Sequence, residues 1–241
     1  MKNLIEVSHV SKSYGKVQAL RDVSFSVKQG ELFGLIGPDG AGKSTLFRIL
    51  TTLLLPDQGS ARVLDADVRV DFRTIRQSVG YMPGRFSLYQ DLTVEENLRF
   101  FATVFHTTVE ENYERIRVIY EQIAPFKQRR AGALSGGMKQ KLALCCALVH
   151  APKVLFLDEP TTGVDPVSRR EFWKMLAYLR QEGITLVVST PFMDEALRCD
   201  RVAFLYEGEI KGIDRPEAIL KQFSEILCPP GLQRKAVDKH T

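Results

Sequence analysis

The stretch "GPDGAGKST", residues 37–45, decides the fold. It matches the pattern G-x-x-x-x-G-K-[ST], follows the apolar run "ELFGLIG" (31–37) and precedes the helix-like run "STLFRILTTLLL" (44–55). A glycine-rich loop between a strand and a helix can fold its backbone amides around phosphate oxygens, and the helix N-terminus adds its positive end. This context predicts a phosphate-binding loop, in preference to a glycine turn that carries a surface lysine.

Two side chains of this loop have a predicted chemical role. Lys43 is placed to reach the β- and γ-phosphates of a nucleotide, and the Ser44 hydroxyl is placed to ligate Mg²⁺. The predicted nucleotide-binding residues are Gly37, Pro38, Asp39, Gly40, Ala41, Gly42, Lys43, Ser44 and Thr45.

A pair of carboxylates ends a second apolar run, "VLFLDEP" (154–160). In open α/β sheets ligands bind at the carboxyl ends of the strands, where these residues would lie. Asp158 suits Mg²⁺, and Glu159 suits polarisation of an attacking water, so Glu159 and Lys43 are the predicted catalytic residues. Acidic residues at strand ends are common, and this motif gains its weight from the loop at 37–45.

A second anion-binding surface is predicted in "LSGGMKQ" (134–140), where Ser135, Gly136 and Gly137 stand at a helix start. One nucleotide needs only one phosphate loop. The additional surface therefore indicates a second nucleotide or a second subunit.

These motifs, in this order, resemble the nucleotide-binding domains of ABC transporters over about residues 4–223, and "SLYQDLTVEENLRFF" most resembles ATPases of ABC-2-type export permeases. The resemblance implies two copies, as a homodimer or heterodimer, that sandwich two ATP molecules, with the signature of one copy capping the ATP of the other. It also implies that Tyr14 stacks on adenine and that Asp165 lies in a loop crossing the dimer interface. Two alternatives stay open: Tyr14 as an ordinary strand aromatic, and Asp165 as a helix N-cap, a role compatible with the interface.

Two positions depart from the family pattern. Gly84 stands where relatives carry a glutamine that senses the γ-phosphate, and Gln90, six residues later, is out of register for that role. Pro191, in "VVSTPFMDEA" (187–196), replaces a histidine that contacts the γ-phosphate. Proline donates no hydrogen bond. We therefore expect normal ATP binding and slow hydrolysis, unless Thr190 or a partner group supplies the contact.

The remaining patterns predict an α/β protein. Residues 1–30 alternate with period two, as in an antiparallel pair, and residues 93–130 have helical spacing behind a capping box formed by Thr93 and Glu96. The predicted fold is a P-loop NTPase core with a mainly parallel sheet, an N-terminal antiparallel β subdomain and an inserted α-helical subdomain. The nucleotide-binding domain is assigned to residues 1–223, its helical part to about 85–150, and a flexible tail to 224–241.

Composition narrows the setting. The chain has 241 residues, of which 44% are apolar and 26% charged, with a formal net charge of +4, as in ordinary soluble globular proteins. No run approaches the about 18 apolar residues of a membrane span, and the N-terminus lacks the apolar core of a signal peptide. The four cysteines lack metal-ligand or disulfide spacing, which favours a reducing compartment.

The resemblance therefore implies an ATP-binding exporter subunit that hydrolyses MgATP to drive a separate ABC permease, peripheral at the cytoplasmic face of the cell membrane. One rival is a nucleotide-gated dimerisation module with little turnover of its own. Gly84 and Pro191 favour that rival, and intact Glu159 opposes it. A second rival is a soluble ABC protein acting on nucleic acid or ribosomes. A single nucleotide domain and the lack of a basic stripe with aromatics disfavour it, so no nucleic-acid partner is expected.

Overall fold

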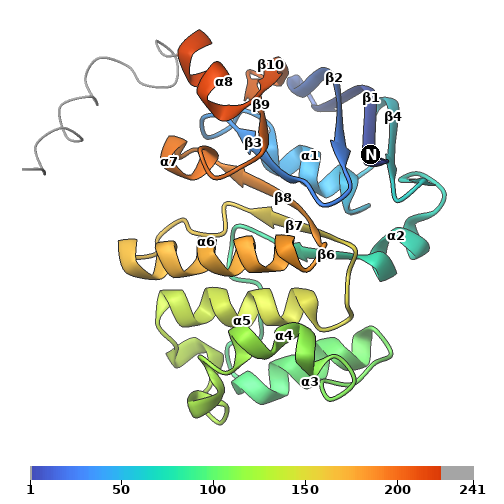
Figure 1. Cartoon of the computed structure of the whole chain (residues 1–241). Helices are drawn as coiled ribbons and strands as arrows, with labels where there is room; N and C mark the ends of the chain where they lie inside the picture. Colours follow the sequence, from blue (N-terminus) through green and yellow to red (C-terminus); the bar gives the residue numbers. More distant parts are fainter. Residues whose placement is uncertain (1, 224–241) are drawn as a thin grey trace, which may run out of the picture.

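The computed structural model describes residues 2–223, so the predicted flexible tail at 224–241 lies outside the described part. The chain forms two sheets (Figure 1). The smaller sheet is antiparallel, with strand order β2-β1-β4-β5. Its strands are β1 (Asn3–Tyr14), β2 (Val17–Lys28), β4 (Gln58–Val63) and β5 (Ala66–Asp67).

The larger sheet has the order β10-β9-β3-β8-β7-β6, and its five strands from β9 to β6 are parallel. Every residue of β3, β7 and β8 is buried. Strands covered on both faces read as continuous apolar runs, as these do in the sequence. The bounds are β3 (Leu32–Ile36), β6 (Val79–Met82), β7 (Val154–Asp158), β8 (Thr185–Thr190), β9 (Arg201–Tyr206) and β10 (Glu209–Asp214).

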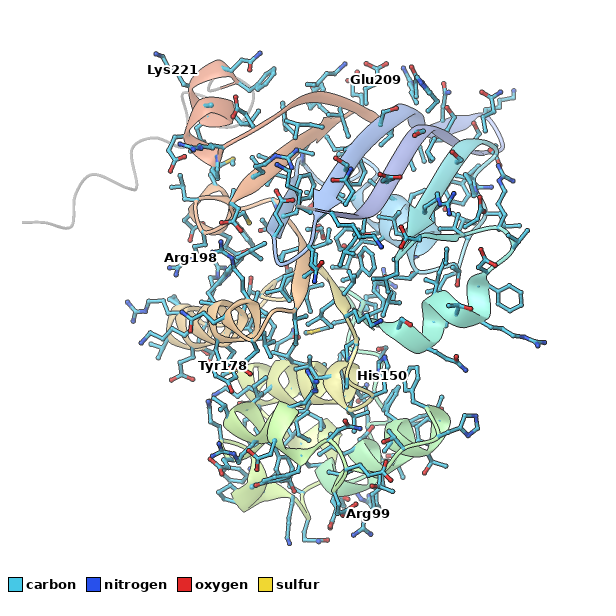
Figure 2. The ribbon with its side chains drawn as sticks, turned by 45° about the vertical axis from the view of Figure 1, so that its right-hand side comes forward. Arg99, His150, Tyr178, Arg198, Glu209 and Lys221 are labelled. Atoms are coloured by element: carbon cyan, nitrogen blue, oxygen red, sulfur yellow. The ribbon has the colours of Figure 1, made fainter. Side chains whose placement is uncertain are left out.

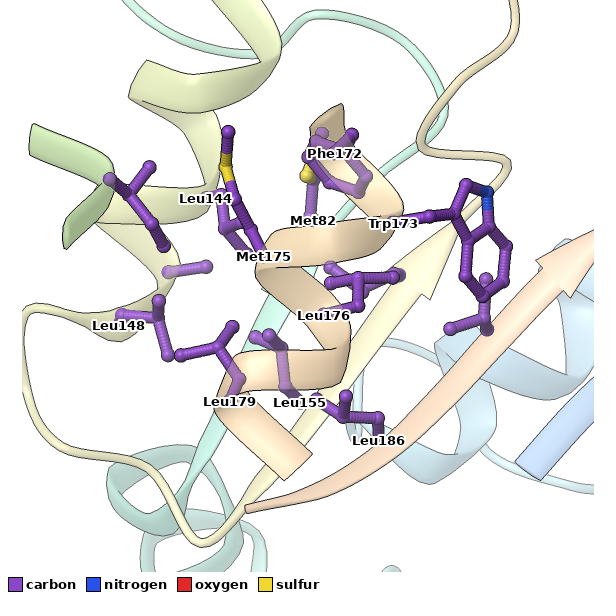
Figure 3. Close-up of a cluster of buried hydrophobic side chains, with 14 of the residues drawn as sticks. Met82, Leu144, Leu148, Leu155, Phe172, Trp173, Met175, Leu176, Leu179 and Leu186 are labelled. Carbon is purple, nitrogen blue, oxygen red and sulfur yellow. The ribbon is translucent and has the colours of Figure 1, made fainter. Parts of the chain in front are cut away.

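Helices cover both faces of the larger sheet, as expected. On one face, α1 (Lys43–Leu50) packs between the two sheets, and α2 (Phe72–Ser78) lies nearby. On the other face, α6 (Pro166–Gln181) and α5 (Gly136–Leu148) pack against each other, with α6 against β8 and α5 against β6. Figure 3 shows the apolar side chains of α6 between those of α5 and the strands: Phe172, Met175, Leu176 and Leu179 of α6, Leu144 and Leu148 of α5, Leu155 of β7 and Leu186 of β8.

The predicted helical insert is present beyond α5. It contains α3 (Val94–Val104), α4 (Tyr113–Tyr120) and the 3₁₀ turns η1 (Ala124–Phe126) and η2 (Ala131–Ala133). The capping box is confirmed, since Thr93 Oγ1 accepts from the Glu96 N–H at 3.1 Å and Glu96 Oε2 accepts from the Thr93 N–H at 2.7 Å. These two bonds satisfy amides that the first helical turn leaves without partners.

Several local features differ from the sequence expectation. The run 44–55 is helical only to Leu50, because the chain turns at Thr52, whose φ of +62° leaves the right-handed helix. Strands β4 and β5 and helix α2 carried no recognised pattern. The short helices α7 (Met193–Ala196) and α8 (Pro216–Gln222) complete the described chain.

Across residues 2–223, no helix combines the length and the apolar character that crossing a membrane requires.

Candidate nucleotide-binding and catalytic site

The register of three buried strands brings the predicted site together. Ile36 at the end of β3 pairs with Thr190 at the end of β8, and Asp158 at the end of β7 pairs with Ser189. The phosphate loop follows Ile36, and Pro191 follows Thr190. The carboxyl ends of parallel strands thus place the loop, Pro191 and the two carboxylates at one edge of the sheet.

Glycine is required at two points of the phosphate loop. A Cβ on Gly37 would lie 2.1 Å from the Leu205 carbonyl oxygen. Gly42 has a φ of +109°, and a Cβ there would lie 2.5 Å from the Ala19 carbonyl oxygen. A residue with a Cβ would clash at either position and would be strained at the φ of Gly42. The two glycines therefore allow the loop to pack closely against the neighbouring backbone.

Lys43 lies inside this curl and is only 3% exposed. Its Nζ donates to the carbonyl oxygens of Gly37 at 2.9 Å and Pro38 at 3.0 Å. The same nitrogen is 3.2 Å from Oε1 of Glu159. The two predicted catalytic side chains are therefore in contact.

Asp158 and Glu159 are both held by Ser189. Asp158 is 4% exposed, and its Oδ1 accepts from Ser189 Oγ at 2.6 Å. The Glu159 N–H donates to Ser189 Oγ at 3.0 Å and to the Ser189 carbonyl at 3.1 Å. Glu159 has a φ of +48°, a left-handed conformation that costs a residue with a side chain about 1–2 kcal/mol. The bonds to Ser189 stabilise this turn and direct the Glu159 side chain toward Lys43.

Two neighbours of the acidic pair were not predicted from the sequence. Ser189 could have been noticed as a hydroxyl within the apolar run "LVVST". Tyr81 on β6 is the other. Burial, reinforced by the nearby Asp158 carboxylate, raises the pKa of Tyr81 to about 12, so its phenol stays neutral beside the acidic pair.

Gly84 follows β6 and lies against the backbone of Asp158 and the Cβ of Glu159. A Cβ there would be 3.0 Å from the Asp158 carbonyl oxygen and 3.9 Å from Glu159 Cβ. A side chain at this position would thus reach the site directly. Gln90 instead packs on Gly132, whose N–H donates to the Gln90 carbonyl at 2.9 Å. This placement agrees with the expectation that Gln90 does not replace the missing glutamine.

Thr190 is fully buried next to Pro191. Its Oγ1 donates to Oε2 of Glu195 at 2.6 Å and accepts from the Phe192 N–H at 3.1 Å. The hydroxyl is therefore engaged by protein groups. This geometry argues against the alternative in which Thr190 supplies the phosphate contact that Pro191 lacks.

Tyr14 is the last residue of β1 and pairs with Val17 at the turn of the β1–β2 hairpin. Its side chain is 45% exposed. An aromatic ring that is half-exposed at a hairpin end is available to stack on a planar ligand. Stacking on adenine stays a prediction.

The signature residues lie against the first turn of α6, which Asp165 caps. Ser135 caps α5 by accepting from the Met138 N–H at 3.3 Å, and a Cβ on Gly137 would lie 2.5 Å from Ser168 Oγ. Asp165 Oδ1 accepts from two N–H groups of α6, at 3.0 Å each, so the N-cap alternative is confirmed. Hydrogen bonds from Ser168 lower the pKa of Asp165. Within residues 2–223, no hydrogen bond joins Ser135, Gly136 or Gly137 to the phosphate loop.

The fold and these contacts define a P-loop NTPase domain. The phosphate loop lies between β3 and α1, and a buried aspartate with an adjacent glutamate ends a neighbouring parallel strand. An insert of helices then extends this core.

Comparisons with known proteins agree with this class. The model of the family described as ABC transporter matches residues 20–162. The probable multidrug ABC transporter ATP-binding protein YbhF of Escherichia coli (strain K12) is 43% identical over 223 residues, covering 92% of this chain and 39% of that protein. The Nod factor export ATP-binding protein I of Rhizobium sp. (strain N33) is 39% identical over 224 residues, covering 92% of this chain and 74% of that protein.

Solved structures share the fold. An ATP-binding subunit of an ABC transporter superposes with a TM-score of 0.82 at 30% identity, over 92% of this chain and 94% of that chain. The bacterial ABC transporter cassette MJ0796, solved as a dimer, gives a TM-score of 0.79 at 27% identity, over 88% of this chain and 98% of that chain.

The chain belongs to the ABC transporter family, as an ATP-binding domain of the ATPase type. It spans 39% of the length of the E. coli relative. The comparisons give no support to the rival in which the domain binds ATP with little turnover of its own.

Proposed function

We propose that this domain binds MgATP together with a second copy or a related domain, and that ATP hydrolysis drives a separate membrane permease. The observation that carries the proposal is the contact of Lys43 with Glu159 beside Asp158 at the mouth of the phosphate loop. One site thus combines a phosphate-binding cation, a candidate metal ligand and a water-polarising carboxylate.

The donor set fits Mg²⁺. Ser44 lies on the first turn of α1, and Asp158 has one carboxylate oxygen bonded to Ser189 and a second one for an ion. Across the described residues, no group of three or more His, Cys, Asp or Glu side chains forms a metal site. This agrees with Mg²⁺ held by few protein oxygens together with nucleotide phosphates and water. When bound, the ion would neutralise phosphate charge.

A second nucleotide-binding domain would complete the site. Ser135 and Gly136 are exposed at the N-terminus of α5, and Val167 in the first turn of α6 is 56% exposed. Backbone amides at that terminus suit the γ-phosphate of an ATP bound by a partner. The dimeric MJ0796 cassette supports this arrangement, and either a homodimer or a heterodimer would satisfy it.

The permease is proposed to bind at an apolar groove beside the helical insert. The groove has a volume of about 590 Å³ and lies among α2, α3, α5 and the end of β6. Figure 2 shows His150 at this junction, at the end of α5. The walls are mainly apolar, their basic side chains are Arg73, Arg76, Arg85, His106 and His150, and the lining includes no carboxylate. A complementary partner is an apolar permease helix that carries acidic residues.

The names of the relatives support export, because they refer to multidrug transport and Nod factor export. We extend only the direction of transport to this chain. Binding to a permease would hold it at the cytoplasmic face of the membrane.

Calorimetry with MgATP tests the nucleotide site. Lys43→Ala should weaken binding by about 10–100-fold, because a charge-assisted hydrogen bond contributes roughly 1.5–3 kcal/mol. Lys211→Ala is the matched control, since Lys211 pairs with Glu209 on β10. Equal ATP affinity of the two variants would remove the basis for the proposal.

Co-purification with the permease tests the groove. Val104→Asp introduces a charge into the groove wall at a side chain that is 51% exposed, and it should abolish co-purification. Val70→Asp is the control, since Val70 is 71% exposed and lies outside the wall. If the permease is retained by Val104→Asp, the complex forms at another surface.

A further inference from the structure

A buried carboxylate beside the site has no role in the function described so far. Glu195 belongs to the short helix α7 and is only 1% exposed, although its neighbour Asp194 is exposed. A carboxylate is costly to bury unless it is paired and hydrogen-bonded. Its contacts therefore indicate what the position achieves.

Glu195 joins three separate segments. Thr161 Oγ1 donates to Oε1, and Thr190 Oγ1 donates to Oε2 at 2.6 Å. Arg169 of α6 places Nε 3.5 Å from Oε1. Its guanidinium also stacks on Phe192, with 4.5 Å between Cζ and the ring centroid. One carboxylate thus links the loop after β7, the end of β8 and the first turns of α6.

The link to Thr161 bears on Glu159. Thr161 is two residues after Glu159, and the Thr162 N–H donates to the Glu159 carbonyl at 3.2 Å. The Val164 N–H closes the next turn by donating to the Thr161 carbonyl at 3.2 Å. The position of Thr161 therefore determines where the left-handed turn at Glu159 lies.

The link to Thr190 bears on Pro191. The Phe192 N–H donates to Thr190 Oγ1, and that hydroxyl is oriented by Glu195. The Pro191 turn is thus held from both sides, by Thr190 within the sheet and by Phe192 beneath Arg169.

We propose that Glu195 is a positioning residue for hydrolysis, which holds the turns at Glu159 and Pro191 in register without touching the nucleotide. The inference rests on the proposed function. A purely apolar contact would serve stability at least as well, because replacing buried ion pairs by hydrophobic groups is often neutral or stabilising. Two hydroxyl donors and one arginine instead give the three segments defined directions.

Glu195→Gln is the first test. The amide keeps the volume but presents an NH₂ group to one of the two hydroxyl donors. We expect kcat for ATP hydrolysis to fall about 10–100-fold. Losses of this size are typical when a residue that orients a site residue through hydrogen bonds, without touching the bound group itself, is replaced. ATP affinity by calorimetry and the thermal midpoint should stay close to those of the parent. Asp194→Asn is the matched control, since Asp194 lies 3.9 Å from Arg169 and its side chain is 70% exposed.

Thr161→Val breaks the same link from the other side. Its kcat loss should not add fully to that of Glu195→Gln in the double variant, because both changes weaken the same hydrogen-bond network around residue 195. Additive losses, an unchanged kcat in Glu195→Gln, or a loss matched by Asp194→Asn would each overturn the inference.

Amide hydrogen exchange separates this inference from the ATPase proposal, because it needs no turnover. In Glu195→Gln, exchange at residues 161–164 should rise relative to the parent and to Asp194→Asn. Unchanged exchange would refute the positioning role even if ATP binds normally. Raised exchange in a chain that binds no ATP would refute the proposed function and leave the contact intact.

Discussion

The ammonium of Lys43 and the carboxylate of Glu159 are in direct contact, with 3.2 Å between Nζ and Oε1. This pair joins the start of α1 to the end of β7, two segments separated by more than a hundred residues of chain. Lys43 is almost fully buried, whereas the Glu159 side chain is 23% exposed. The exposed edge of the pair is where a water and a γ-phosphate would meet.

Glu159→Gln should preserve ATP binding and abolish hydrolysis, because the amide keeps the shape of the side chain and no longer polarises water as a carboxylate does. With saturating MgATP the variant should therefore accumulate as a dimer, measured by size-exclusion chromatography with light scattering. ADP in place of ATP is the control, and it should leave the variant monomeric. A monomer with ATP, both alone and with the permease, would contradict the sandwich of two domains.

Ser189→Ala should reduce activity through the metal site. Ser189 Oγ donates to Asp158 Oδ1 and accepts from the Glu159 N–H, so its loss frees Asp158 Oδ1 and leaves the Glu159 N–H bonded only to the Ser189 carbonyl. We expect the Mg²⁺ concentration for half-maximal hydrolysis to rise about tenfold, with a smaller change in ATP affinity. Ser60→Ala, on the exposed part of β4, should behave like the parent. An unchanged Mg²⁺ requirement would assign Ser189 a role in folding alone.

Pro191→His combined with Gly84→Gln should raise the rate of steady-state phosphate release. Both positions border the site, and neither offers a side-chain donor in the present chain. One well-placed transition-state donor is worth about 10²–10³ in rate, although effects within one site seldom add. Each single variant serves as a control for the pair. A rate that is unchanged or lower in the double variant would mean that this site has its own catalytic arrangement.

His150 should make stability depend on pH. Burial lowers its pKa from the ordinary value of 6.5, although Nε2 contacts the Val79 carbonyl at 2.9 Å. Since the unfolded chain then binds the proton more readily, the imidazole favours folding fully above pH 6.5 and progressively less as the pH falls below it. Urea denaturation at pH 7.5 and 5.5 should show a smaller loss for His150→Gln than for the parent. His106→Gln, at an exposed site, should lose as much as the parent.

The sequence predicted those parts of the fold that depend on local patterns. The phosphate loop, the buried strands β3, β7 and β8, and the capping box of Thr93 each follow from short-range spacing. Strands β4 and β5 and helix α2 lacked such a signal, because most of β4 is exposed and α2 has a single buried residue. The position of β4 depends on pairing with β1, which is a long-range contact, and β5 and α2 follow from it, because β5 pairs with β4 and α2 packs on β5 and β6.

In the candidate site, too, some residues were predictable from local sequence motifs and others were not. Lys43, Asp158 and Glu159 were predicted because glycines and adjacent carboxylates form motifs along the chain. Their support was not predicted, because it comes from strand register: Ser189 reaches Asp158 only when β7 and β8 pair, and Glu195 meets Thr161 only in the folded chain. These hydrogen bonds join residues that are more than thirty positions apart, so they produce no short sequence motif from which they could be predicted.

Pro191 also has an effect that does not involve the nucleotide. Thr190 is extended at the end of β8, which is the conformation that a following proline favours. Because the ring restricts the unfolded chain as well, a proline that fits its native conformation stabilises a protein by about 0.4–1 kcal/mol through the lower entropy of the unfolded state. A histidine at position 191 would restore a hydrogen-bond donor for the γ-phosphate, but it would also remove the limit that the proline ring sets on the conformations of the unfolded chain. The same substitution that favours chemistry would therefore make the unfolded chain more favourable, so that catalytic gain and thermal resistance oppose each other at one residue.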